Sequence, residues 1–346
     1  MAGLFSWISA FFSGSGTEKT PSEPKLLNPS ASQNKHEPAD QPATNNLEEN
    51  LFCWLLDAPP MKLNKELDRK DLAVLDTLKQ RVRRQTLEEL PRRPMTLPSL
   101  TRAISDDTAG RKGLADIILS DPALTDQILH VANSPMFRVG DKPIESVDQA
   151  VFLLGLNGIR NVISAAVMRP MMSARNSREA LFAQKVWRWG LTCARAAEMV
   201  ARVEGKDGSF YFMSGLLPAL SYITLQRELL RICRTADQPT EPSSALVQHA
   251  LSQFQWAAAQ VLADKWQLPP DYHAQLMEAE RPQPDQTQAP LNDGIIIGTR
   301  EVLRHANQRN MTEDEVLKLV HIKPDQFTRI RQTILDSLKE GSRAGA

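Results

Sequence analysis

Apolar residues recur at helical spacing through most of the chain, and no segment shows the alternation of a half-buried strand. The longest periodic run extends from Glu179 to Val203. Further helices are predicted at residues 209–218, 222–234, 244–266, 290–308 and 324–339. Helix-start signals stand at Asp121-Pro122, at Ser146 with Gln149, and at Thr312 with Glu315. The pattern predicts an all-α fold, a multi-helix bundle.

Residues 1–13 are amphipathic when wound as a helix. One arc carries the large apolar residues Leu4, Phe5, Trp7, Ile8, Phe11 and Phe12, while glycine and serine occupy the other. The segment has neither the basic region nor the cleavage signal of a secretory leader. We expect a short amphipathic helix that attaches to a membrane surface by apolar insertion or docks on a partner protein. A frayed terminus is the simpler alternative.

Residues 14–50 are rich in proline, serine, asparagine and charged residues, and they contain almost no large apolar side chain. Such a segment cannot bury enough surface to offset its ordering entropy, so we predict a disordered linker, or tether. Apolar residues return at Leu51, and a helical stripe follows between Asn64 and about Leu90. Residues 51–89 are therefore predicted to form a helical connector.

Charge is balanced, with 41 basic and 41 acidic side chains, which argues against a nucleic-acid-binding domain that depends on a broad positive field. One basic cluster comprises Lys79, Arg81, Arg83, Arg84, Arg92 and Arg93. Two glutamates interrupt it, and no aromatic residues interleave to stack on bases. A solvated helix face is the favoured interpretation. A nucleic-acid-binding regulator that uses Arg81–Arg93, with Arg83 and Arg84 at the interface, is an alternative.

The three cysteines, Cys53, Cys193 and Cys233, lie far apart and form no CxxC pair. Neither a disulfide framework nor a cysteine zinc site is therefore predicted, and a reducing compartment fits best. No apolar run reaches the roughly 20 residues that a membrane-spanning helix needs. We expect a cytoplasmic protein, at most peripheral at the inner face of the membrane.

Three long segments carry a resemblance to a known family. They are LPRRPMTLPSL at 90–100, LADIILSDPALTDQILHVANSPMF at 114–137 and ESVDQAVFLLGLNGIRNVISAAVM at 145–168. These segments resemble the N-terminal half of the HDOD domain, a degenerate relative of the HD metal phosphohydrolases that occurs mainly in bacterial signalling proteins. Weaker similarity continues to about residue 280. The resemblance implies an HD-like helical domain at 90–285, with helices in 286–346 that complete or extend the bundle.

The resemblance also indicates where metal ligands would stand. In the HD enzymes, histidines and aspartates from several helices bind divalent cations that activate water. Where related sequences have Gly-Leu-Leu-His-Asp, this chain has Gly-Leu-Leu-Pro-Ala, which places Pro218 and Ala219 at the His-Asp positions. Trp189 stands at an upstream histidine position and Gln255 at a later one. We therefore expect no catalytic residue, no metal and no cofactor, and hence no enzyme.

Other histidines could supply ligands instead. His130 lies four residues after Asp126 and His305 four after Glu301, so each pair shares a helix face. A surface hydrogen bond is the commoner role of such an isolated pair. A divergent HD-type metal phosphohydrolase with ligands from His130, His273 or His305 is the enzymatic alternative. Of the remaining histidines, His36 lies in the predicted linker, and His249, like His273 and His321, has no clustered acidic partners.

Two groups of large side chains are candidates for a binding surface. The methionines follow a strongly apolar helix and are interpreted as core; they are Met168, Met171 and Met172. Trp187 and Trp189 flank one helical residue and so point in different directions. We expect at least one of these tryptophans near the surface, where it would be a candidate for a protein interface.

Together these observations predict a non-catalytic signal-transduction or adaptor protein that acts through protein–protein interaction. The resemblance implies protein partners in a bacterial signalling pathway, and residues 1–13 add a possible membrane-surface tether. The divergent phosphohydrolase and the nucleic-acid-binding regulator are the alternatives. The sequence leaves open the pathway, the oligomeric state and whether the vacated metal pocket binds a nucleotide.

Overall fold

The computed structural model of the chain describes residues 43–105, 110–133, 143–235, 240–281 and 287–343. Within them every regular element is a helix, which confirms the all-α prediction. Residues 1–42 lie outside the described part of the chain, and so do the predicted amphipathic helix at 1–13 and most of the predicted linker. Those two predictions stay predictions.

The first described helix begins earlier than the sequence pattern suggests. Helix α2 (Ala43–Leu56) starts inside the predicted linker 14–50, so the linker boundary at residue 50 is wrong. Leu47 is the reason, because it is buried together with Leu51 and Phe52 of the following turn. In the sequence Leu47 stands alone among polar residues, which hides its place on the buried face.

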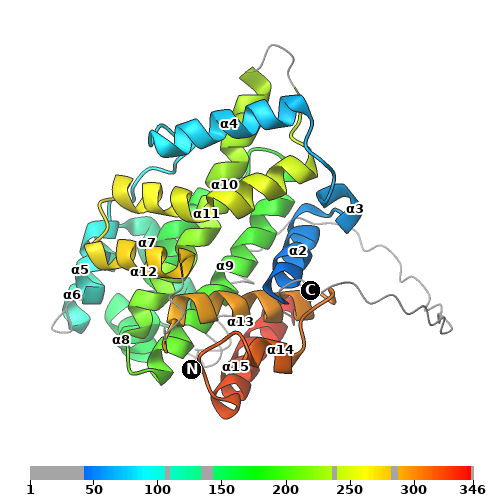
Figure 1. Ribbon diagram of the computed structural model, residues 1–346. Helices are drawn as coiled ribbons and strands as arrows, with labels where there is room; N and C mark the ends of the chain where they lie inside the picture. Colours follow the sequence, from blue (N-terminus) through cyan, green and yellow to red (C-terminus); the bar gives the residue numbers. More distant parts are fainter. Residues whose placement is uncertain (1–42, 106–109, 134–142, 236–239, 282–286, 344–346) are drawn as a thin grey trace.

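Two further helices lead from α2 into the bundle, namely α3 (Pro60–Leu63) and α4 (Arg69–Arg83). Helix α4 lies across α10 and α11 at one end of the molecule (Figure 1). Helix α4 is shorter than the helical pattern between Asn64 and about Leu90 that predicted it. The Asp68 side chain accepts a hydrogen bond from the backbone N–H of Asp71 and caps its start, and Gln85 has a φ of 55° just beyond its end.

The next helices form the N-terminal half of the bundle, and they are α5 (Leu97–Ser105), α6 (Arg111–Leu119), α7 (Pro122–Ala132), α8 (Val147–Met168) and the short η1 (Arg169–Met172). Asp121 and Ser146 cap α7 and α8 as predicted. Gly155 interrupts α8 with a φ of 71°, which an L side chain rarely adopts. Met168 and Met172 are buried, which confirms their assignment to the core.

Among the described residues, the segment 147–172 is long and apolar enough to cross a membrane. Within its most apolar window 67% of the residues are buried inside the molecule. The helix packs against α6 and α7, so packing accounts for its apolar character.

Three long helices make up the centre of the bundle, α9 (Ser177–Val203), α10 (Gly208–Thr235) and α13 (Pro290–His305). Glycines on α10 and α13 let the backbones approach α9 closely. A Cβ atom at Gly215 would lie 2.6 Å from Cα of Ala194, and one at Gly294 would lie 2.4 Å from Cα of Ala197. Helix α13 thus belongs to the core of the bundle, which fits the prediction that residues after 285 complete it.

The sequence suggested a helix at 209–218 and another at 222–234, and this division is wrong. Helix α10 runs unbroken through Pro218. A proline inside a helix removes one backbone hydrogen bond and costs about 3 kcal/mol, so something must offset it. The residues of α10 from Tyr211 to Leu225 are all buried, and this packing holds the helix together across the proline.

The remaining helices are α11 (Ser244–Lys265), α12 (Pro270–Glu280), α14 (Glu313–Leu317) and α15 (Pro324–Arg343). Helix α11 packs along α10, and α15 packs against α13 and α9. The capping box predicted at Thr312 and Glu315 is complete. Figure 1 shows α14 and α15 at the opposite end of the molecule from α4.

Candidate functional site

The positions at which an HD enzyme would hold its metal lie on three neighbouring helices. Trp189 lies on α9, Pro218 and Ala219 lie on α10, and Gln255 lies on α11. The structure brings the first three positions to one tight contact between α9 and α10. A Cβ atom at Gly190 would lie 2.5 Å from Cβ of Ala219, so the two helices already touch there.

Trp189 fills the interior next to this contact. Its side chain is 2% exposed, and its Nε1–H donates a hydrogen bond of 2.8 Å to Oγ1 of Thr299 on α13. Its ring stacks on Tyr222 of α10 with 4.8 Å between the centroids, and Phe52 of α2 lies 6.0 Å from the Tyr222 ring. One aromatic cluster therefore ties together four helices.

The residues at these positions do not fit a divalent cation. Proline and alanine side chains carry no ligand atom, and the indole N–H of Trp189 is a donor already engaged by Thr299. Cys193 is close by, but burial raises the pKa of its thiol far above the ordinary value. Gln255 is half-buried and makes no hydrogen bond with the described residues. We therefore derive no metal-dependent step.

The other histidines of the described chain are held singly. His273 Nδ1 lies 2.9 Å from Oε1 of Gln260, and His249 Nδ1 lies 2.9 Å from the carbonyl oxygen of Ala245. Glu301, predicted to share a face with His305, is fully buried and pairs with Arg300 and Arg331 instead. The side chain of His130 lies outside the described residues.

One titratable group was missed by the sequence analysis. Asp293, fully buried on α13, accepts hydrogen bonds from the backbone N–H of His321 at 2.7 Å and from its ring at 2.9 Å. Burial raises the pKa of Asp293, and burial also raises that of Glu204 at the end of α9. These residues are far apart in the chain, and no sequence spacing links them. The contact fastens the segment after α14 to α13.

No set of three or more histidine, cysteine, aspartate or glutamate side chains in the described ranges is arranged to hold a metal ion. The buried carboxylates of the described residues instead contact arginines, backbone amides or, at Asp293, the ring of His321. Glu228 shows this clearly: it accepts Arg81 Nη1 at 2.5 Å and the backbone N–H groups of Glu88 and Glu89 at 2.9 and 3.0 Å. Such pairs hold the connector on α10.

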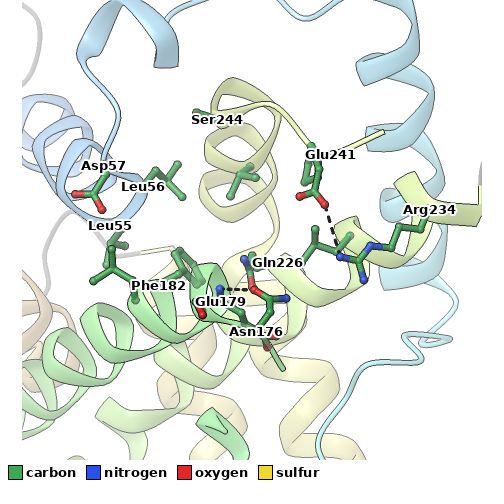
Figure 2. A pocket seen from close by; sticks show the side chains of 15 residues that line it. Leu55, Leu56, Asp57, Asn176, Glu179, Phe182, Gln226, Arg234, Glu241 and Ser244 are labelled. Carbon is green, nitrogen blue, oxygen red and sulfur yellow. Dashed lines mark hydrogen bonds and ion pairs between the residues drawn. The ribbon is translucent and has the colours of Figure 1, made fainter. Parts of the chain in front are cut away.

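A cavity of about 730 Å³ opens between α2, α9, α10 and α11 (Figure 2). Its walls combine apolar side chains, such as Leu55, Leu56 and Phe182, with the amides of Asn176 and Gln226. Its volume is in the range of small-molecule sites. None of the four degenerate positions lines it.

The charged groups of this cavity are already compensated. Glu179 pairs with Arg227 at 2.6 Å, Asp57 with Lys185 at 2.5 Å, and Glu241 with Arg234 at 3.6 Å. Asn176 accepts a hydrogen bond from the backbone N–H of Glu179 and so caps α9, as Figure 2 shows. The arrangement offers a surface for binding but no nucleophile with an adjacent base.

The basic cluster does not form one continuous face. Arg81 is bound to Glu228 and Glu88, whereas Arg83 and Arg84 are exposed at the end of α4. Arg92 and Arg93 belong to the segment that follows, where Nη1 of Arg93 donates to Gln267. The separation removes Arg81 from any nucleic-acid interface.

The tryptophans are not surface anchors, so the prediction of an exposed interface residue at Trp187 or Trp189 is wrong. Trp187 is 3% exposed, and the guanidinium of Arg169 lies 5.6 Å from the centroid of its ring. Helix α9 is buried on several sides at once, by α10, α13, α2 and η1. Trp187 and Trp189 point in different directions from α9, and neighbouring helices bury both of them.

Comparison with known proteins agrees with this geometry. The sequence pattern of the HDOD domain matches residues 90–282. None of the curated proteins compared with the chain shows significant similarity. Among solved structures, an HDOD domain protein of unknown function from Geobacter sulfurreducens is similar, with 17% identity and a TM-score of 0.50 over 79% of this chain and 93% of that one.

Two proteins from Shewanella amazonensis SB2B share the fold as well. Their names assign them provisionally to the phosphohydrolases, one of them to the metal-dependent kind. They have 17% and 16% identity to this chain, with TM-scores of 0.54 and 0.51; each alignment covers 78% of this chain and 98% or 100% of the other. Likeness at this identity concerns the fold alone. The sequence match over more than half of the chain shows that this protein belongs to the HDOD domain family.

Proposed function

We propose that this protein is a non-catalytic signal-transduction or adaptor protein of the cytoplasm, acting through contacts with protein partners. The observation that carries the proposal is the packing of Trp189. Its indole is hydrogen-bonded to Thr299 and stacked on Tyr222, in the place where an HD enzyme would hold a metal ligand. Pro218 and Ala219 remove the His-Asp pair beside it.

The enzymatic alternative is tested directly. The full chain is expressed in medium supplemented with manganese, iron and zinc, and its metal content is measured by elemental analysis. We expect far less than one bound ion per chain and no turnover of bis(p-nitrophenyl) phosphate above the buffer rate. A stoichiometric metal with metal-dependent turnover would overturn the proposal.

The partner side of the proposal needs a matched pair of chains. We compare the full chain with a version that starts at Ala43, because a start at Leu51 would cut through helix α2. Partners that both versions retain bind the helical bundle. Partners that only the full chain retains depend on residues 1–42.

Residues 1–13 are proposed to attach the protein to the inner face of the membrane or to a partner. The support is the apolar arc of residues 1–13, followed by a proline-rich linker that would span about 30 Å by random-coil scaling. Deleting residues 2–13 should abolish flotation with liposomes. Unchanged flotation and unchanged distribution in cells would rule out the membrane version.

A further inference from the structure

A second cavity, of about 670 Å³, is lined by other residues than the one in Figure 2. Its walls are the segment 91–96, the first turns of α7, the end of α8 with η1, and Arg227 of α10. We call it the arginine groove, after Arg92, Arg93, Arg175 and Arg227.

The segment 91–96 is held in place although it has no regular structure. Nε1–H of Trp266, which is buried, donates a hydrogen bond of 2.9 Å to the carbonyl oxygen of Pro91. Nη1 of Arg93 donates to Oε1 of Gln267 at 2.6 Å. This wall of the arginine groove is therefore formed before any ligand arrives.

Most of the arginines retain unused donors. Arg227 is committed, since it donates to Glu179 and to the carbonyl oxygens of Met171 and Ser173. Arg175 gives one Nη2 to Glu89, and its side chain stays 63% exposed. Arg92 is exposed and forms no ion pair with the residues that the structure describes. A guanidinium has five N–H donors, so Arg92, Arg93 and Arg175 can each bind a further anionic group.

The acidic side chain in the groove does not cancel this charge. Oδ1 of Asp121 accepts the backbone N–H groups of Ala123 and Leu124 at 3.0 and 3.2 Å and so caps α7. Asp121 keeps its negative charge, but Arg92 and Arg93 form no ion pair with the described residues and together outweigh this single carboxylate. The arginine groove favours a negatively charged ligand.

The remaining walls favour a peptide over a small anion. The groove is much larger than a single phosphate, since about 670 Å³ is open to a ligand. The floor contains Leu124 and Val167, both buried. Met95 at the rim is 94% exposed, and methionine adapts readily to varied apolar partners.

We propose that the arginine groove binds an acidic segment, with interspersed apolar residues, of a partner protein. The inference rests on the proposed function, because it names the site and the chemistry of one partner contact. Arg92, Arg93 and Arg175 would bind the carboxylates, and Leu124, Val167 and Met95 would contact the apolar side chains.

The test is a peptide-display selection on the immobilised full chain, with the affinities of selected peptides measured by fluorescence anisotropy. We expect enrichment of peptides rich in aspartate and glutamate. Binding should weaken roughly 10- to 30-fold in the variant R92A/R93A and should fall with added salt. The matched control R83A/R84A removes the same charge from exposed arginines outside the groove and should bind as the native chain does.

Binding of inorganic pyrophosphate is measured in parallel, because a groove that takes only a compact anion would bind pyrophosphate and no acidic peptide. Loss of fold is checked by the midpoint of urea unfolding in each variant. Pyrophosphate that binds while no acidic peptide does would overturn the proposal, as would selection of no acidic peptide or equal losses in R92A/R93A and R83A/R84A.

If the groove proposal is wrong, the experiments give a different result than if the proposed function is wrong. If partners recovered with the full chain persist in R92A/R93A, the groove proposal falls and the adaptor function stands. If the full chain holds a stoichiometric metal and turns over phosphoesters, the function falls whatever the groove binds.

Discussion

Replacing Trp189 with alanine tests whether this residue holds the interior between α9, α10 and α13 together. The side chain is 2% exposed, stacks on Tyr222 and donates to Thr299, so its removal leaves a cavity, an unstacked ring and an unpaired hydroxyl. Truncation of a buried tryptophan to alanine costs about 3–5 kcal/mol. We expect the free energy of unfolding to fall by that amount.

A second variant separates the contributions. Trp189→Phe keeps an aromatic ring on Tyr222 but removes the indole N–H, so it should cost roughly 1–3 kcal/mol from the lost hydrogen bond and the smaller ring. Urea unfolding followed by far-UV circular dichroism gives both values. Leu72→Ala is the control, because Leu72 is 53% exposed and its truncation should change stability by less than about 0.5 kcal/mol.

The result that would refute the reasoning is specific. If Trp189→Ala lost less than about 1 kcal/mol, the aromatic cluster would not be holding the centre of the bundle. The same would follow if Trp189→Ala and Trp189→Phe had equal effects, since the ring itself would then contribute nothing.

Three further outcomes are expected from urea unfolding. Gly294→Ala should destabilise the fold because its Cβ would lie 2.4 Å from the backbone of α9, whereas Gly113→Ala, with open space around it, should add about 0.5–1 kcal/mol. Asp293 has a raised pKa when folded, so it binds its proton more tightly in the folded state and its contribution to stability falls as pH rises from about 3.9 through the folded pKa. Asp293→Asn should therefore gain relative to the native chain as pH rises above about 4, and a constant difference would contradict this. Deleting residues 1–42 should leave the unfolding midpoint unchanged, while deleting 1–50 should lower it because it removes half of α2.

Sequence reasoning located helices well where apolar periodicity was long. The run from Glu179 to Val203 corresponds to α9, and 244–266 corresponds to α11, because each buries a continuous stripe. It failed where tertiary contacts decide. The predicted gap between residues 218 and 222 is absent, because the buried residues around Pro218 keep α10 continuous across it. Leu47 carried too little local pattern to mark the start of α2.

The candidate site was predicted in part. The resemblance identified Trp189 as a replaced ligand position, but it did not show that Thr299, 110 residues later, accepts the indole N–H. The sequence showed one basic cluster interrupted by two glutamates, and the fold divides it further, because Arg81 pairs with Glu228 while Arg92 and Arg93 border a groove. Pairings between distant helices leave no trace in local spacing.

Restoring the missing ligands would not by itself rebuild a metal centre. In the double variant P218H/A219D, the aspartate would be placed against Gly190, where Cβ of Ala219 already meets α9. Trp189 would still occupy the neighbouring interior. Overpacking a core typically costs about 1–3 kcal/mol, and a buried carboxylate without a partner costs more.

Removing the proline returns about 3 kcal/mol to the helix and opposes these costs, so the prediction concerns metal alone: P218H/A219D should bind none. A cation that binds only the folded state raises the free energy of unfolding by RT ln(1 + [L]/Kd), so urea unfolding with and without Mn²⁺ measures binding directly. The midpoint should be the same in both solutions. A rise with Mn²⁺ in the variant but not in the native chain would show that the helices can still close around an ion, and that the replacement of two side chains, rather than the packing of α9 on α10 and α13, removed it.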